Sequence, residues 1–430
     1  MRWIHVVVVV LLLLLGLPFV LSLAVPSSRQ RRQRRGLNDP EERQISVLAK
    51  ALRVMYQQGG TLAVLRRSEG MQDYEGESLV RAAMEASHGD KGVASGILNA
   101  LIGSCCLYQD SVAGALQACA LMKAYDAQNA VLEPDLVSLC LAYVATCPDE
   151  SLGGTQAEGF LRRAENLYPT PATVDEAKSQ PDWAAVKAHG IDLFQETDDF
   201  ILLSKPSGMV CYHAGPSQSF RGKRKGRDDS LEMCLLQNGV ALSTLNQQGR
   251  GLVHRLDRGT SGVMVLAKTN RMHAVLLAEK FFLRRVDKSY QALVVKGDVP
   301  LPVRGMIDCD IDGRPAKSKY RVQKTSVGSL FARLQVKTEQ GRRHQVRLHC
   351  AQGLGTPILL DPRYAGLAIL SRLQSLSLEH KHLASRLAEH RAVQRFCLHA
   401  DSLTIGGVGI QVKAPLPMWW QALEKELDKV

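Results

Sequence analysis

The sequence lacks the patterns that indicate a metal site or a redox cofactor. Its ten cysteines form no C-x-x-C pair, and no glycine-rich dinucleotide-binding loop is present. Most of the cysteines lie inside apolar runs, which favours buried free thiols in a reducing compartment over a disulfide framework. His380 and His382 are two positions apart and do not share a helical face, so they do not indicate a metal site. We therefore expect neither a metal nor a cofactor.

Acidic residues and lysine are absent from the first 36 residues, which contain six arginines. The whole chain has a formal net charge of +12, and this segment supplies half of it. The remaining positive charge suits a polyanionic partner, because basic surfaces attract phosphate groups. A mildly basic, solvated surface gives the same total, so both interpretations stay open at this point.

Proline is absent between Pro40 and Pro134, and no run typical of a strand occurs between residues 39 and 187. Apolar residues in this region recur at spacings of three and four, which predicts helices. With 430 residues, the chain exceeds the length that one hydrophobic core usually serves. The predicted division is a targeting segment at 1–36, an all-α domain at 37–180 and a second domain at 181–430.

Two stretches of the helical region resemble successive pentatricopeptide repeats. Leu101-Ile102 and Ala142-Tyr143 hold equivalent places 41 residues apart, so one unit would carry an insertion near residues 126–131. Asn99 is placed either for a base contact or as a helix cap. A repeat domain of this kind would lie along single-stranded RNA. The alternative is a stack of helical hairpins that packs on the second domain or on another protein.

The most specific feature is the stretch 251–262, in which Asp257 lies between basic residues and a Gly-Thr-Ser-Gly run. Apolar runs flank it on both sides, which predicts a buried strand that enters and leaves a tight loop. A single Asp in a turn is commonly a cap or an Asx-turn. Here His254, Arg255 and Arg258 surround the aspartate with positive charge, which keeps a carboxylate ionised and available for covalent or base chemistry.

The string His254-Arg255-Leu256-Asp257, completed by Thr260-Ser261-Gly262, resembles the active-site motif of the RluA-type RNA pseudouridine synthases. The resemblance extends over most of the second domain, well beyond this one motif. The other matching stretches are Lys205-Pro206-Ser207-Gly208, Lys288-Ser289-Tyr290, residues 314–322, residues 341–349 and Leu398-His399-Ala400.

The resemblance implies the pseudouridine synthase fold, an α+β domain with a long, mixed, mostly antiparallel sheet and flanking helices. It also implies an isomerase that converts uridine in RNA to pseudouridine without a metal or a cofactor. The carboxylate of Asp257 would reach the ribose of the target uridine, where it either adds to the anomeric carbon or removes the neighbouring ribose proton. Arg347 corresponds to the basic residue that pairs with this aspartate, and Tyr290 corresponds to the tyrosine that faces the base.

The same resemblance assigns substrate-binding residues around Asp257. Arg255 would help to fill the space that the uridine vacates when it leaves the helix. Thr260 and Ser261 would fix the loop by hydrogen bonds, whereas a structural role is expected for His254. The remaining members of the substrate-binding set are Arg258, Arg342, His344 and Gln345.

The sequence departs from the family's pattern at two places that support the site. Arg343 stands where the family has Thr, and residues 355–361 lack the usual His and the Gly before Asp361. Both departures bear on substrate positioning more than on activity. In addition, residues 366–394 are rich in His and Arg, and we expect them to form a helical insertion that is longer than the family's loop here. We expect residues 217–227 to form a basic loop that either touches RNA phosphates or is solvated.

The N-terminal segment also indicates the compartment to which the protein is targeted. A short basic start and an apolar run over residues 6–25 end in the small-x-small site Ser22-Leu23-Ala24, which is typical of a signal peptide. Residues 26–35 are rich in Ser and Arg and acid-free, as in an organelle transit peptide. This two-part layout resembles the targeting sequences of algae with complex plastids, so we expect a plastid protein. A mitochondrial protein, a membrane anchor in the secretory system, an RNA-binding arm and a nuclear signal are the alternatives.

Two alternatives to an active synthase follow from the same sequence. One is a non-catalytic RNA-binding protein built on the same fold, and the other is an organelle RNA-processing factor in which the helical domain is the main actor. The presence of Asp257, Tyr290 and Arg347 together favours the enzyme. The expected partner is RNA, namely rRNA, tRNA or mRNA, and the expected oligomeric state is a monomer.

Overall fold

The computed structural model divides the chain into two compact units, with residues 1–169, 274–283 and 312–314 in the first and the rest in the second. The described residues are 95, 98–99, 102–103, 105, 111–126, 136–146, 150–167, 180–213, 230–246, 249–279, 285–296, 300–313, 315–325, 330–338, 341–364, 385–390 and 392–428. The predicted targeting segment and the basic loop at 217–227 lie outside these residues. No helix within them has the length and apolar composition that a membrane span requires.

The first unit contains α6 (Ser111–Asp126), α7 (Leu136–Thr146) and α8 (Glu150–Leu167). Most of the described side chains of α7 are apolar and buried, in keeping with its packing against both α6 and α8. Arg163 of α8 donates two hydrogen bonds, of 2.9 and 2.7 Å, to the carboxylate of Asp126. Asn99 accepts a hydrogen bond of 2.5 Å from the hydroxyl of Ser138 in α7. The helical prediction is confirmed for these residues, and the pentatricopeptide relationship stays a prediction.

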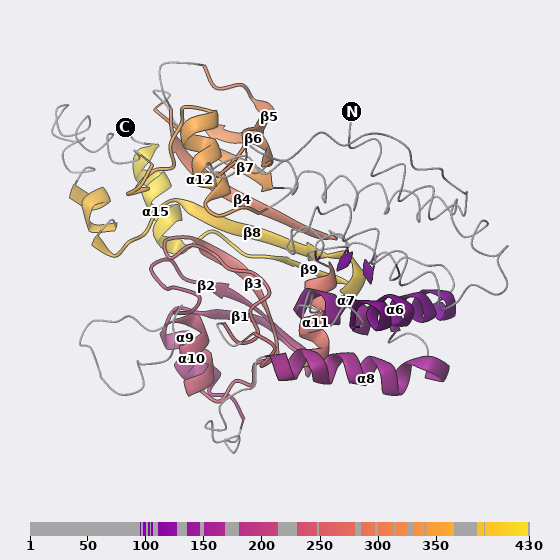
Figure 1. The fold of residues 1–430 in the computed structure, drawn as a ribbon. Helices are drawn as coiled ribbons and strands as arrows, with labels where there is room; N and C mark the ends of the chain where they lie inside the picture. The colour runs from indigo at the N-terminus through magenta and orange to yellow at the C-terminus, as the bar shows by residue number, and fades with distance from the viewer. Residues whose placement is uncertain are drawn as a thin grey trace, which may run out of the picture. The chain divides into compact units, whose positions relative to one another are not determined.

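The second unit is built on one nine-stranded sheet (Figure 1). Eight strands follow the order β1-β2-β3-β8-β4-β7-β6-β5, and β9 pairs with β8. Every neighbouring pair is antiparallel except β3 and β8. This arrangement confirms the predicted α+β class with a mixed, mostly antiparallel sheet. The strands are β1 (Asp192–Glu196), β2 (Phe200–Lys205), β3 (Ser261–Ala267), β4 (Val286–Val295), β5 (Arg304–Asp308), β6 (Lys317–Thr325), β7 (Phe331–Thr338), β8 (Leu398–Ile405) and β9 (Ile410–Lys413).

Short helices accompany the sheet, and the sequence explains where several of them begin. Asp182 and Ser230 cap α9 (Trp183–Ala188) and α10 (Leu231–Gln237), since each side chain accepts a backbone N–H of the first turn. The predicted insertion at 366–394 is described only at 385–390, which are helical, and at 392–394. The remaining elements are α11 (Asn270–Ala278), α12 (Gln345–Leu348), a π-helix (His349–Gly353), a 3-10 helix (Gly406–Val408) and α15 (Met418–Leu427).

The two halves of the sheet meet where β3 pairs with β8 in parallel, through Ser261–His399 and Gly262–Ala400. One hydrophobic core packs on β2 and β3, and another packs on β4 and β7. Tyr290 of β4 contacts both cores. A glycine is required at position 262, because its φ is +119° and an added Cβ would lie 2.2 Å from the carbonyl oxygen of Ala400. The stretch 251–262 therefore ends in the residue that lets the two halves approach.

Substitution of Gly262 should destabilise the protein far more than substitution of a glycine that is only conformationally constrained. We expect Gly262→Ala to lower the free energy of unfolding by about 3 kcal/mol or more, because a strained backbone and a steric overlap add together. Gly409→Ala is the matched control, since Gly409 has a φ of +66° but open space around it, and should cost about 1 kcal/mol. Urea unfolding of both variants measures the difference. Equal losses would contradict the proposed role of close strand approach.

Candidate active site

Asp257 lies in the loop before β3, and Lys205 at the end of β2 contacts this loop. The ammonium group of Lys205 is fully buried and donates hydrogen bonds to the carbonyl oxygens of Pro206 (2.9 Å), Met209 (2.7 Å) and Arg258 (3.4 Å). Burial lowers the pKa of Lys205 to about 8. These contacts join the Lys-Pro turn to the residue directly after Asp257, so Lys205 braces the loop that carries the aspartate.

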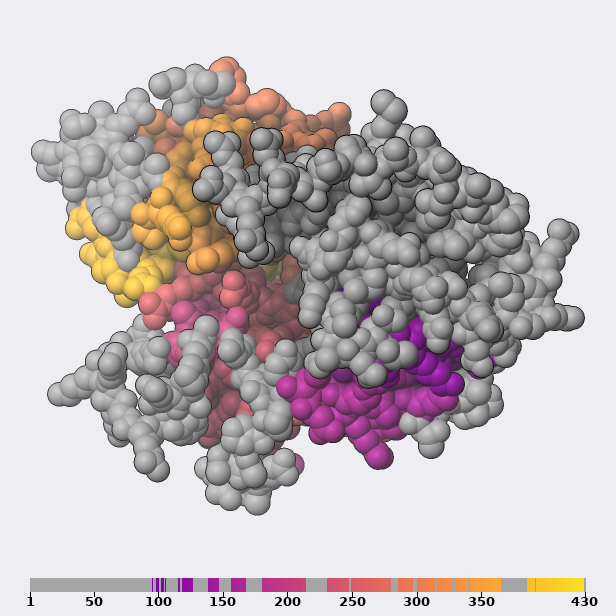
Figure 2. Space-filling model, in the orientation of Figure 1, coloured from indigo at the N-terminus to yellow at the C-terminus, as the bar shows by residue number. Residues whose placement is uncertain are grey.

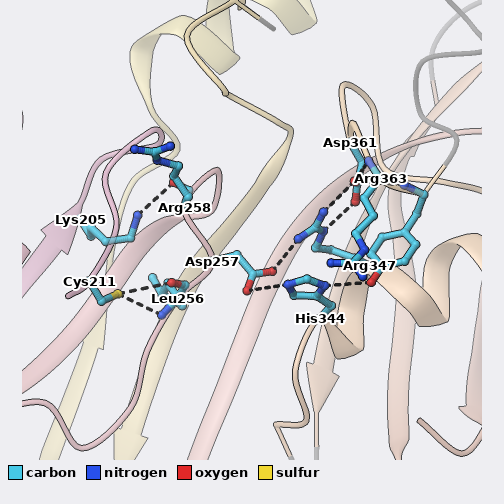
Figure 3. Close-up of polar contacts among 10 residues, drawn as sticks. Lys205, Cys211, Leu256, Asp257, Arg258, His344, Arg347, Asp361 and Arg363 are labelled. Carbon is cyan, nitrogen blue, oxygen red and sulfur yellow. Dashed lines mark hydrogen bonds and ion pairs between the residues drawn. The ribbon is translucent and has the colours of Figure 1, made fainter. Parts of the chain in front are cut away.

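A second contact fixes the residue on the other side of the aspartate. The thiol of Cys211 lies 3.3 Å from both the carbonyl oxygen and the backbone nitrogen of Leu256. Figure 3 shows Asp257 between this part of the chain and the segment that contains Arg347. The backbone is thus held at positions 256 and 258, and the side chain of Asp257 projects from a fixed loop.

Arg347 binds the carboxylate of Asp257 from the opposite side. Its Nη1 lies 3.0 Å from Oδ2 of Asp257, while Nε and Nη2 form a two-pronged pair with Asp361 at 2.7 and 2.8 Å (Figure 3). Asp361 is fully buried, whereas 27% of the Asp257 side chain is exposed. One guanidinium group is therefore shared between a structural carboxylate and a carboxylate that a substrate can reach.

The surroundings of Arg347 keep its guanidinium group charged and in place. Its side chain is only 7% exposed, and the group lies 5.0 Å from the ring of Tyr364 and 4.7 Å from the ring of Phe396. Burial lowers the pKa of Arg347, but the hydrogen bonds and charges of the two carboxylates outweigh burial and raise this pKa above its usual value. Arg347 belongs to α12, in the segment coloured orange in Figure 2, which reaches the surface of the face shown there.

His344 faces the second oxygen of the carboxylate. Its Nε2 lies 3.5 Å from Oδ1 of Asp257, and its Nδ1 lies 2.8 Å from the hydroxyl of Tyr364. Burial lowers the pKa of His344, and three neighbouring arginines add to this effect against the opposing charge of Asp257. The arginine at position 343, where related motifs have Thr, is one of these neighbours and is exposed.

Tyr290 lies in β4 at an irregularity of the sheet. The pairing of β4 with β8 shifts between Ser289 and Tyr290, which leaves Asp401 as an extra residue in β8. Tyr290 is half-buried, and burial followed by the charge of Asp257 raises its pKa to about 12. The hydroxyl is therefore protonated throughout the neutral range, and the ring is near enough to Asp257 to feel its charge.

Three other motif residues of the Asp257 loop have separate positions. Arg255 is exposed and donates to the Tyr212 hydroxyl at 3.1 Å. His254 is buried, and its Nε2 accepts the backbone N–H of Val265 at 3.2 Å, which is the structural role expected for it. Arg258 donates to the carbonyl oxygen of Gly208 at 3.1 Å and to the side chain of Gln394 at 3.0 Å.

Thr260 holds the loop through its backbone. Its backbone N–H donates to the carbonyl oxygen of Asp257 at 3.0 Å, while its buried hydroxyl has no partner among the described residues. The hydroxyl of Ser261 is the one that forms a hydrogen bond, at 2.8 Å from His399. Both residues therefore form hydrogen bonds at the loop, Thr260 through its backbone and Ser261 through its side chain.

Arg342 and Gln345 support α12 from within the protein. Gln345 is buried, accepts the backbone N–H of Arg342 at 2.8 Å and donates to the carbonyl oxygen of Lys317 at 2.8 Å. The guanidinium of Arg342 lies 3.4 Å from the carbonyl oxygen of Pro315. Gln345 therefore holds the helix against β6, and the structure gives it no surface for a substrate contact.

Asp361 is the residue of this site whose role the motif analysis missed. The related pattern has a glycine before it, and Leu360 occupies that position here with a left-handed φ of +69°. The backbone geometry that a glycine usually provides is thus kept by a buried leucine, at a cost of order 1–2 kcal/mol. Because the geometry is kept, the carboxylate of Asp361 still reaches Arg347.

The arrangement can act as a nucleophile or a base. A partly exposed carboxylate is fixed by a cation on one oxygen, and a protonated phenol lies near it. Among the residues that the structure describes, no group of three or more His, Cys, Asp or Glu side chains is arranged to hold a metal ion.

Comparison with known proteins shows similarity over this region. Residues 199–352 match the family model described as RNA pseudouridylate synthase. The Ribosomal large subunit pseudouridine synthase D of Xanthomonas campestris is 31% identical over 252 residues, which cover 55% of this chain and 69% of that protein. The chloroplastic RNA pseudouridine synthase 2 of Arabidopsis thaliana is 34% identical over 35% of this chain and 39% of that protein. The solved structure of human RNA Pseudouridylate Synthase Domain Containing 4 aligns with a TM-score of 0.40 and 23% identity, over 57% of this chain and 94% of that one.

Removing the charge of Asp361 should destabilise the whole unit, because Arg347 stays buried with half of its pairing lost. We expect Asp361→Asn to lower the free energy of unfolding by about 3 kcal/mol. The matched control is Asp308→Asn, which breaks an exposed ion pair with Lys317 at 2.8 Å and should cost less than about 1 kcal/mol. Urea unfolding compares the two variants. A loss for Asp361→Asn no larger than that of the control would show that the shared arginine does not stabilise the site.

Proposed function

Because this chain belongs to the RNA pseudouridine synthase family and converts uridine in RNA to pseudouridine, we propose that Asp257 is its catalytic carboxylate and that its substrate is ribosomal RNA. The observation that carries the assignment is the contact between Arg347 and a carboxylate that remains partly exposed. The substrate class is supported by the ribosomal large subunit named in the Xanthomonas relative.

The reaction defines what the carboxylate has to do. The bond between N1 and C1′ breaks, a bond between C5 and C1′ forms, C5 loses a proton and N1 gains one, so no oxidant is required. Asp257 either adds to C1′ or removes the proton on C2′, and both routes need an ionised carboxylate with a free lone pair. Arg347 stabilises the ionised form through Oδ2 and leaves the other lone pairs of the carboxylate for the ribose.

Tyr290 is proposed to support the uracil ring while it is detached and rotated. Its aromatic face supplies a stacking surface, and its hydroxyl stays protonated because its pKa is raised to about 12. Tyr290 therefore acts as a neutral hydrogen-bonding group rather than as a phenolate in the resting enzyme.

A uridine in a helix has to leave the base stack before a carboxylate can reach its ribose. Arg255 is the proposed occupant of the vacated space, since its side chain is exposed and lies next to the motif aspartate. Arg258 is proposed to contribute positive charge at the edge of the site around Asp257, where it would contact the phosphate backbone of the RNA.

We propose a plastid as the compartment and a pentatricopeptide-like RNA contact for the helical unit. The chloroplastic relative from Arabidopsis supports the compartment, as does the two-part layout of residues 1–36. The paired helices α6, α7 and α8 support the helical-repeat assignment. The protein is proposed to act as a monomer.

Pseudouridine mapping tests the proposed function and names the substrate. Cells that lack the protein should lose pseudouridine at one or more positions of organellar ribosomal RNA. The wild-type protein should restore these positions, whereas Asp257→Asn should not, because an amide neither attacks C1′ nor removes a proton. Asp308→Asn is the control, since it removes an exposed carboxylate of the same unit, and it should restore them fully.

Two results would contradict the assignment. If no ribosomal position is lost in the null cells and another RNA loses one, the proposed substrate is wrong. If Asp257→Asn restores the lost positions, Asp257 is not the catalytic carboxylate.

A further inference from the structure

We propose that neutral His344 is a positioning residue for Asp257, and that the hydroxyl of Tyr364 selects the tautomer in which Nε2–H points at the carboxylate. The proposal rests on the assignment of Asp257 as the catalytic group. Three features of the described residues carry it, namely the two contacts of the imidazole, the backbone of His344 and the distribution of charge around it.

The contacts determine which nitrogen carries the proton. Nε2 of His344 lies 3.5 Å from Oδ1 of Asp257, and an ionised carboxylate accepts but does not donate. A lone pair on Nε2 would be repelled there, so Nε2 carries the hydrogen and Nδ1 accepts. The Tyr364 hydroxyl, 2.8 Å from Nδ1, is then the donor. Its hydrogen bond stabilises the tautomer that Asp257 needs.

The backbone of His344 indicates that its position serves the site rather than the helix. His344 precedes α12, but its side chain makes no capping hydrogen bond and its φ is +57°. A left-handed backbone in a residue other than glycine costs of order 1–3 kcal/mol and is concentrated at functional sites. Here the strained turn directs the imidazole toward Asp257 instead of toward the first turn of the helix (Figure 3).

The surrounding charges favour a neutral imidazole. The groups that act on His344 are Asp257 in the motif loop, Arg347 of α12, Arg343 beside it and Arg363 after Asp361. The one negative charge is opposed by three positive charges, and burial also disfavours the imidazolium. A neutral donor orients a carboxylate without adding a second cation that would weaken its basicity.

The distance of 3.5 Å between Nε2 and Oδ1 is longer than a strong hydrogen bond. Hydrogen bonds of catalytic groups are often long in the free enzyme and shorten in the complex. When the ribose engages Asp257, the hydrogen bond from Nε2 to Oδ1 would shorten and hold the carboxylate against rotation about its χ2 angle. Arg347 on Oδ2 and His344 on Oδ1 would then fix both oxygens.

Ring ¹⁵N spectroscopy of histidine tests the tautomer without any RNA. In the full-length protein, the signals that vanish in His344→Gln should show the Nε2–H tautomer at pH 7 and should titrate below the usual histidine pKa of about 6.5. Tyr364→Phe should convert them to a mixture of tautomers. An Nδ1–H tautomer, or a charged ring at pH 7, would overturn the proposal.

Single-turnover kinetics test the consequence for catalysis, with RNA from cells that lack the protein as the probe. His344→Gln and His344→Asn form a matched pair. The Gln amide nitrogen is as many bonds from Cα as Nε2, whereas the Asn amide is one bond shorter but better suited to a left-handed backbone. We expect His344→Asn to be the more stable variant and to lose about tenfold in rate. His344→Gln should lose less.

Tyr364→Phe should also slow the reaction several-fold without changing the RNA concentration that half-saturates the enzyme. Tyr320→Phe is its control, since it removes the hydroxyl of a buried tyrosine in β6, and its rate should equal that of the wild type. Rates that follow stability, with Asn above Gln, would show a merely structural role and overturn the proposal. A wild-type enzyme that does not modify this RNA would instead contradict the proposed function.

Discussion

Arg347 serves two carboxylates at once, and the geometry of the site depends on this sharing. Asp361 takes two of its N–H groups in a fully buried pair, so the guanidinium is held before it meets Asp257. Asp257 receives one N–H from a group that is already fixed, and its own loop is fixed from the other side by Lys205. The carboxylate of Asp257 therefore bridges the two halves of the sheet, which meet at the short parallel pairing of β3 with β8.

The sequence predicted those features of the fold and the site for which the residue type indicates the role. The apolar run after the Asp257 loop predicted a buried strand, and this run is β3. The resemblance implied that Arg347 pairs with Asp257, which lies 90 positions earlier, and the two side chains are in contact at 3.0 Å. His254 also has a structural contact, in keeping with the role that the resemblance implied for it.

The remainder depended on geometry that residue types do not reveal. Leu360 adopts a left-handed backbone that glycine usually provides. The turn before Asp361 could therefore not be predicted from the residue type at position 360. Gln345 belongs to a motif with substrate-facing residues, but its side chain is turned into the protein. The parallel pairing of β3 with β8 joins strands far apart in the chain, and no local pattern specifies such a partner.

A structure of the Asp257→Asn enzyme bound to its target RNA tests the central claim most directly. The account predicts that the target uridine lies outside the base stack, with C1′ or C2′ of its ribose about 3–3.5 Å from the side chain at position 257. The uracil should rest on Tyr290, and Arg347 should keep its two-pronged pair with Asp361. A uridine still stacked in the RNA, or a ribose that approaches another carboxylate, would contradict the account.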